Sequence, residues 1–285
     1  IGGRAGELLP ITAGVVQPNF AGDTAANGLY GKQDGFIAKF SPDGTQVIWA
    51  TYFGTSGRDI LRDIDIDASG NVYVGVTGTS SSFPAGIITP NAFQPTIGGG
   101  DDGAIAKISS DGKQVLFASY IGGTLDDGQA TAVRVDPSGN VYVAMGVKSN
   151  NITTSSNAFQ KTNSGGLFDL FLMKINPNAA SPSSSLIYAT YFGGSGEEGS
   201  ETHYLNFDQS GNDYVSGGTN SNNLPISVVP GFKKTNSGAY DAHVAKISPD
   251  GSTLLAGTYL GGSGNYGIKV IAVENTVVYV GVPTE

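Results

Sequence analysis

Short stretches of alternating apolar and polar residues recur along the whole chain, and none has the 3.6-residue period of a helix. In the first third of the chain these stretches are 36–40, 46–53, 61–67 and 72–76, each of a length typical of a strand. Turn sequences separate them, namely Ser41-Pro42-Asp43-Gly44 and Ala68-Ser69-Gly70-Asn71. The pattern predicts four short antiparallel strands followed by a long loop.

Three sequence anchors of this unit return further along the chain. An Asp-to-Lys anchor occupies 34–39, 102–107, 169–174 and 241–246, and an anchor with a central Tyr and a final Gly occupies 50–54, 118–122, 189–193 and 257–261. A third anchor, Asp-x-Ser-Gly-Asn before a strand, lies at 67–74, 136–143 and 208–215, with a worn copy at 274–280. The repeat units are therefore about 34–101, 102–168, 169–240, and 241–285 with 1–33. Units of this length stack because none can bury its apolar face alone.

Four-stranded antiparallel units in tandem are the blades of a β-propeller. We therefore predict an all-β fold, a single β-propeller domain over 1–285 with four blades of four antiparallel strands. The segments DGFIAKFSPDG, ATYFGGSG, VDPSGNVYV and FP…NAFQ resemble the bacterial SBBP-type β-propeller repeat over essentially the whole chain. That resemblance implies secreted or surface-anchored bacterial proteins without shared catalytic machinery. The nickname of the repeat refers to seven blades, whereas this chain has sequence repeats for four.

The resemblance also implies that the hairpin with the DIDID and NVYV segments is the inner pair of a blade, and that FIAKF and VIWATYF form the outer pair. On that assignment the last blade takes its inner hairpin from 268–282 and its outer hairpin from 35–53. Pairing of the N- and C-terminal hairpins would close the ring and leave no long free edge. The alternative is that 1–285 is an excerpt of a larger propeller.

The charge and composition of the chain argue against two classes of binding partner. A net charge of −9 and a pI near 4.6 argue against nucleic acid and anionic membranes, both of which favour a basic face. The chain has no Cys, and it has no apolar stretch long enough to span a bilayer as a helix. It begins at Ile1 without a signal-peptide pattern, so we expect a processed or partial product.

Residues present in every copy are expected to build the blade. We assign the Asp of the first anchor to a strand-start hydrogen bond and its Lys stem to contact with aromatic neighbours. Trp49, Phe117 and Tyr188 share one position and are expected to fill the core, and Tyr52, Tyr120, Tyr191 and Tyr259 are expected to be buried. The Asp-x-Ser-Gly-Asn turns lack the bidentate Glu of a calcium loop, because Val76 stands twelfth from Asp65. Asp and Asn side chains that bind their own turn explain them better.

Differences between copies mark candidate ligand-binding residues. The loops that link one blade to the next carry Asp59, Asp126, Asp127, Glu197, Glu198 and Glu201. If these loops gather on one face near the axis, they form an acidic surface that is either solvated or neutralised by a cation or a cationic partner. We expect no cofactor, with weak calcium binding as the one candidate.

Catalytic patterns are weak. His243 stands where two other copies have Phe36 and Phe171, which favours packing, and His203 near three Glu residues lacks a metal-ligand spacing. No nucleophile elbow or phosphate-binding loop is present. We therefore predict a non-enzymatic, extracellular or cell-surface bacterial scaffold that binds a protein partner or assembles with copies of itself. The alternative is a carbohydrate-binding or glycan-degrading propeller.

Overall fold

The computed structural model describes residues 1–22, 33–57, 59–79, 81–198, 204–228, 230–264, 270–275 and 277–281. Regular structure in these residues is almost entirely antiparallel strand, which confirms the all-β prediction. The exceptions are a one-turn helix, α1 (Pro182–Ser185), and a 3-10 turn, η2 (Pro225–Val228).

Three complete four-stranded sheets occupy the middle of the chain, and we call them blades A, B and C. Blade A contains β4 (Ile60–Ile66), β5 (Val72–Thr79), β6 (Asp102–Ile108) and β7 (Val115–Ile121). Blade B contains β8 (Gln129–Val135), β9 (Val141–Val147), β10 (Asp169–Ile175) and β11 (Leu186–Phe192). Blade C contains β12 (Tyr204–Phe207), β13 (Asp213–Thr219), β14 (Asp241–Ile247) and β15 (Leu254–Leu260). In each blade an Asp-x-Ser-Gly-Asn turn joins the first two strands, and the next outer hairpin along the chain supplies the other two, as the resemblance implied.

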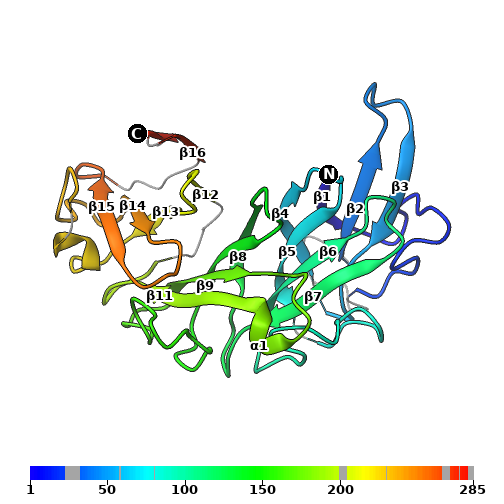
Figure 1. Ribbon diagram of the computed structural model, residues 1–285, viewed down its shortest axis with the longest axis horizontal. Coiled ribbons are helices and arrows are strands. Elements are labelled where there is room, and N and C mark those ends of the chain that lie inside the picture. The colour runs from blue at the N-terminus through cyan, green and yellow to red at the C-terminus, as the bar shows by residue number, and fades with distance from the viewer. Residues whose placement is uncertain are drawn as a thin grey trace.

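Two incomplete sheets flank these blades. The N-terminal sheet has the order β1-β2-β3, with β1 (Gly2–Ala5), β2 (Asp34–Phe40) and β3 (Val47–Tyr52). The C-terminal hairpin is β16 (Val270–Glu274) with β17 (Val277–Gly281). Figure 1 shows the five sheets along an open arc, with the N-terminal sheet at one end and the C-terminal hairpin at the other.

The expected closure between 268–282 and 35–53 does not form in the described residues. There β17 pairs with β16 alone, and the edge of β2 that it would need is already paired with β1, through contacts such as Gly3↔Phe36. By register, β1 holds the place that the second strand holds in a complete blade, since Gly217 of β13 faces His243 of β14 in the same way. The described residues therefore contain three complete blades and no closed ring.

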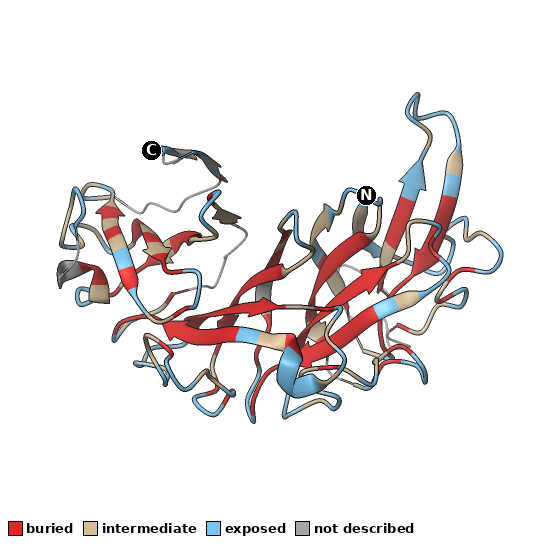
Figure 2. Cartoon of the chain, viewed as in Figure 1, coloured by how far each residue is buried: buried red, intermediate tan, exposed pale blue. Residues whose placement is uncertain are grey.

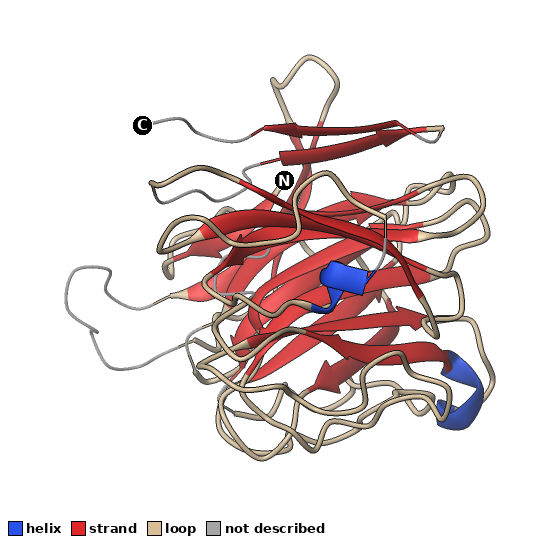
Figure 3. Ribbon diagram, turned by 90° about the vertical axis from the view of Figure 1, so that its left-hand side faces the viewer, coloured by secondary structure: helices blue, strands red, loops and turns tan. Residues whose placement is uncertain are grey.

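The core lies between sheets and not inside any one of them. Each of the three apolar clusters joins two neighbouring sheets: the N-terminal sheet with A, A with B, and B with C. Figure 2 shows the buried strands running through the middle of the arc, and Figure 3 shows the sheets stacked with loops at the strand ends. The repeated Tyr52, Tyr120, Tyr191 and Tyr259 are at most 2% exposed, which confirms their predicted burial.

Two faces of a sheet follow from the alternation of side chains along a strand. We call the face toward the next sheet along the chain the forward face, and the face toward the preceding sheet the rear face. In β6, for example, Ile105 lies in the cluster shared with blade B, whereas Ala104 and Ala106 lie in the cluster shared with the N-terminal sheet. Middle strands are consequently buried on both faces, as in β6, β9 and β10.

Candidate functional site

The Asp at the start of β2, β6, β10 and β14 is fully buried and ties the preceding long loop to its sheet. In blade A, Asp102 Oδ2 accepts hydrogen bonds from the Gly98 backbone N at 2.8 Å and from Gln94 Nε2 at 2.9 Å. The equivalent bonds join Ala21 N to Asp34, Ser164 N to Asp169 and Ser237 N to Asp241. The strand-start interpretation of this anchor is therefore confirmed.

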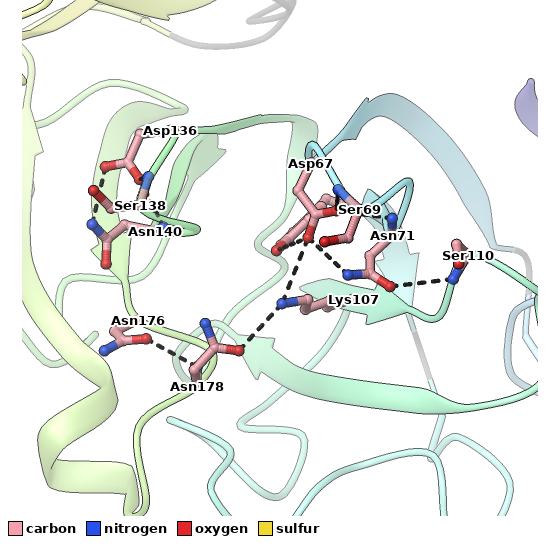
Figure 4. Close-up of polar contacts among 11 residues, drawn as sticks. Asp67, Ser69, Asn71, Lys107, Ser110, Asp136, Ser138, Asn140, Asn176 and Asn178 are labelled. Carbon is pink, nitrogen blue, oxygen red and sulfur yellow. Dashed lines mark hydrogen bonds and ion pairs between the residues drawn. The ribbon is translucent and has the colours of Figure 1, made fainter.

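The anchor Lys pairs with the Asp of the Asp-x-Ser-Gly-Asn turn in its own blade. Figure 4 shows this network in blade A, where Lys107 Nζ lies 3.8 Å from Asp67 Oδ2 and the same carboxylate caps the turn by accepting from Ser69 N and Asn71 N. The ammonium also lies 5.3 Å from the centre of the Tyr73 ring. Blades B and C repeat the ion pair as Lys174–Asp136 at 3.6 Å and Lys246–Asp208 at 3.0 Å. These carboxylates hold turns and lysines, which confirms the turn interpretation.

Three of the six acidic loop residues face inward and brace their own loops. Asp59, Asp127 and Glu198 are fully buried. Each accepts a hydrogen bond from the backbone N four residues earlier: Thr55 to Asp59 at 2.7 Å, Gly123 to Asp127 at 2.7 Å and Gly194 to Glu198 at 2.8 Å. Such a bond closes the connecting loop, so these carboxylates have a structural task at each junction between sheets.

The other candidates have separate surroundings. Asp126 is exposed and forms an ion pair with Lys148 at 3.1 Å. The Tyr240 hydroxyl donates to Glu197 Oε2 at 2.6 Å, and Glu201 lies outside the described residues. Within the described ranges, no three His, Asp or Glu side chains gather closely enough to hold a metal ion.

Each buried loop carboxylate lies close to the buried Asp of the neighbouring strand start, which creates an acid pair at three junctions. The pairs are Asp34 with Asp59, Asp102 with Asp127, and Asp169 with Glu198. Burial, with a smaller contribution from the negative partner, raises the pKa of Asp59 and of Asp169 to about 7. At neutral pH Asp59 and Asp169, with a pKa of about 7, are therefore each about half protonated.

A glycine precedes each brace because the anchor carboxylate fills the space that a side chain would need. A β-carbon added at Gly122 would lie 2.2 Å from Asp102 Oδ1, and one at Gly193 would lie 2.4 Å from the carboxyl carbon of Asp169. The Gly that ends each aromatic anchor thus belongs to the same acid junction. Sequence analysis missed this junction, although the constant four-residue spacing between the bonded N–H and the carboxylate was a usable signal.

His243 packs in the core of the described structure. It is fully buried with its ring 5.5 Å from that of Phe192, and burial lowers its pKa to about 4, so the imidazole is neutral. This confirms the packing interpretation. His203 lies outside the described residues.

An apolar depression marks the forward face of blade C. A pocket of about 410 Å³ there is lined by Val244, Ala256 and Leu260 of the outer strands and by Val278 and Val280 of β17. The forward faces of blades A and B are each covered by a complete neighbouring sheet. The sheet next to blade C has only the hairpin β16–β17 and lacks an outer pair of strands, which leaves this depression. Among the described segments, no helix is long and apolar enough to cross a membrane.

A search of curated proteins finds no match to this chain. Residues 48–84, by contrast, match the family model described as SBBP, beta-propeller repeat. The matched segment runs from β3 through β5, and it includes the first aromatic anchor, the acid loop with Asp59 and the first Asp-x-Ser-Gly-Asn turn. The same features recur in blades B and C, and residues 48–84 carry the β-propeller repeat of the SBBP family.

Proposed function

We propose that this chain is a non-enzymatic interaction scaffold of a secreted or cell-surface bacterial protein. The observation that supports this proposal is the internal engagement of the repeated polar residues. The strand-start Asp, the turn Asp and the loop carboxylate each bind a backbone N–H or a Lys of the same framework. An acid–base pair for hydrolysis needs two carboxyl groups that face a substrate from differentiated environments. Buried braces repeated at successive junctions do not offer that arrangement.

The proposal also concerns how the blades are arranged. We infer that blades A to C are part of a propeller-like array in which every sheet is covered on both faces, because the covered faces of A and B are apolar and tightly packed. A closed four-blade ring would require β17 to replace β1 beside β2. A larger propeller or an assembly of several chains requires no closure within one chain.

Glycan recognition or hydrolysis is the competing function, and one experiment separates the two. The purified chain is incubated with a panel of soluble glycans, and both reducing ends and the shift in melting temperature are measured. We expect neither released reducing ends nor a shift. Release of reducing ends that disappears in Asp126→Asn or Glu197→Gln, the more accessible loop acids, would replace the scaffold proposal with a glycosidase.

A further inference from the structure

The forward face of blade C is partly exposed where its counterparts are buried. At the central position of the third strand, Val244 is partly exposed, whereas Ile37, Ile105 and Leu172 are at most 3% exposed. On the outermost strand Leu260 is partly exposed, whereas Phe53, Ile121 and Phe192 are fully buried. The position that pairs with the anchor Lys carries Ala256 here and an aromatic residue in the other sheets, which deepens the pocket.

The rear face of the N-terminal sheet is open at the tip of the β2–β3 hairpin, although Tyr52 on the same face is buried beneath its own loop. Phe40 is 40% exposed, whereas its counterparts Ile108, Ile175 and Ile247 are fully buried. Figure 2 shows the exposed tip of the β2–β3 hairpin at the end of the arc. Ile48 is exposed as well, but so are its counterparts Leu116, Ile187 and Leu255, so that position belongs to the outside of every blade.

The turn of the outer hairpin is also less covered in the N-terminal sheet than in blades A and C. A β-carbon added at Gly112 would touch the Trp49 ring of the preceding sheet at 2.6 Å, and one at Gly251 would touch Tyr188 at 2.4 Å. A β-carbon at Gly44, the equivalent turn of the N-terminal sheet, would have no described atom within 4 Å. This turn therefore lacks the neighbour that the other two turns have.

Polar groups at the two ends are also complementary. Lys39 donates to the Ser110 carbonyl at 3.2 Å, in place of the turn carboxylate that each of the other three anchor lysines reaches in its own blade. Tyr279 of β17 is 56% exposed, whereas Tyr73, Tyr142 and Tyr214 are buried beneath a lysine. The N-terminal sheet thus has an outer hairpin and a lysine, and the C-terminal hairpin has an inner pair and a tyrosine.

We propose that copies of this chain associate head to tail, with the β2–β3 hairpin of one copy completing the blade begun by β16–β17 of another. The β2–β3 hairpin covers the pocket on blade C, and β17 takes the place of β1 beside β2. The interface repeats the A–B and B–C interfaces of the same chain, which is the basis for choosing a second copy as the occupant. Within one chain the two surfaces lie at opposite ends of the arc (Figure 1).

Strand exchange at β2 is favoured by the small size of β1. It has four residues, and none of its side chains is fully buried. β17 has five residues with an unpaired outer edge in the described structure, and it brings Tyr279 to the position that faces the anchor Lys in the other blades. A heterologous contact of this kind continues until a ring closes or a filament forms. This inference rests on the scaffold function and names its partner.

Sedimentation velocity over a dilution series of the full chain tests the association. We expect species larger than a monomer that dissociate on dilution. Leu260→Glu on the forward face and Phe40→Glu on the rear face should each weaken association by roughly tenfold or more, because either one buries an unpaired charge. Ile48→Glu is the matched control, since it places the same charge on a strand position that is exposed in every sheet.

A mixture of the two variants distinguishes head-to-tail contact from a symmetric dimer. Leu260→Glu chains retain an intact N-terminal sheet, and Phe40→Glu chains retain an intact blade C face. Their equimolar mixture should therefore form a 1:1 heterodimer but nothing larger. A wild type that remains monomeric at the highest concentration, or association that both variants leave unchanged, overturns the proposal. Neither result would produce glycan hydrolysis, so the scaffold function is tested separately.

Discussion

The hydroxyl group of the repeated anchor Tyr stabilises the start of a long loop in the N-terminal sheet and in blades A to C. In blade B, Tyr191 is fully buried, accepts a hydrogen bond from Ile152 N at 3.1 Å and donates one to the Ser149 carbonyl at 2.9 Å. Equivalent loop N–H groups donate to the other three hydroxyls, namely Leu9 to Tyr52, Phe83 to Tyr120 and Leu224 to Tyr259. The ring therefore fills the core while the hydroxyl fixes the loop.

Two substitutions at this position separate these contributions. Tyr191→Phe keeps the ring but leaves the Ile152 N–H and the Ser149 carbonyl unpaired, which should cost roughly 1–3 kcal/mol of unfolding free energy. Tyr191→Ala also removes the ring from the A–B core, and the total should reach roughly 3–5 kcal/mol, the usual range for a buried aromatic residue. The difference between the two variants is the contribution of the ring.

Urea unfolding followed by fluorescence measures both losses, and hydrogen exchange of the Ile152 amide reports on the loop. Tyr279→Phe, measured at a concentration where the chain is monomeric, is the control, because Tyr279 is 56% exposed and loss of its hydroxyl should change the unfolding free energy by less than about 0.5 kcal/mol. If Tyr191→Phe matches this control and the Ile152 amide keeps its protection, the hydroxyl does not fix the loop. If Tyr191→Ala costs less than about 1 kcal/mol, the assignment of this ring to the core is wrong.

Three further predictions concern the acid junctions. Because Asp59 and Asp169 have a pKa near 7 when folded and an ordinary value of 3.8, the folded state binds the extra protons. Their contribution to stability is therefore fully present below pH 4 and declines as pH rises to about 7. Urea midpoints should be lower at pH 8 than at pH 5, and the decline should be smaller in Asp59→Asn. A higher midpoint at pH 8 would contradict this. Gly193→Ala should cost roughly 1–3 kcal/mol in the same assay, since its β-carbon would meet Asp169, and an unchanged midpoint would show that the junction has room. Calorimetry with calcium should give equal, small heats for the wild type and for Glu197→Gln/Glu198→Gln, because Glu198 is already bonded inside its loop, whereas a heat lost in the variant would establish a calcium site.

The strands could be predicted from sequence because each has a local signal that tertiary packing reinforces. The stretches 36–40, 61–67 and 72–76 correspond to β2, β4 and β5 within a few residues, and Pro or Gly turns mark their ends. Internal repetition then identified framework residues, and the structure confirms this for the strand-start Asp and the anchor Lys. Both pair within the blade wherever a complete blade exists.

The acid loops were harder to predict because the direction of a loop side chain has no periodic signal. Asp126 and Asp127 are adjacent in sequence, yet one is exposed and the other is fully buried beneath its loop. Closure was harder still, because it depends on competition for one strand edge. The segment 2–5 has no strong strand pattern, but it pairs with β2 and occupies the edge that the C-terminal hairpin needs.

The most direct test of the open arc measures the distance between its two ends within one chain. In blade A the two hairpin turns touch through the Ser110 N to Asn71 Oδ1 bond at 3.2 Å. Spin labels on Thr45→Cys and Glu274→Cys, exposed positions in a chain without other cysteines, report whether the corresponding turns of the two incomplete sheets meet. With doubly labelled protein in excess unlabelled chain, we predict no strong dipolar broadening. We predict strong broadening when singly labelled Thr45→Cys and Glu274→Cys chains are mixed. Broadening that persists in the doubly labelled protein after dilution would show that each chain closes on itself, and it would contradict the open arc.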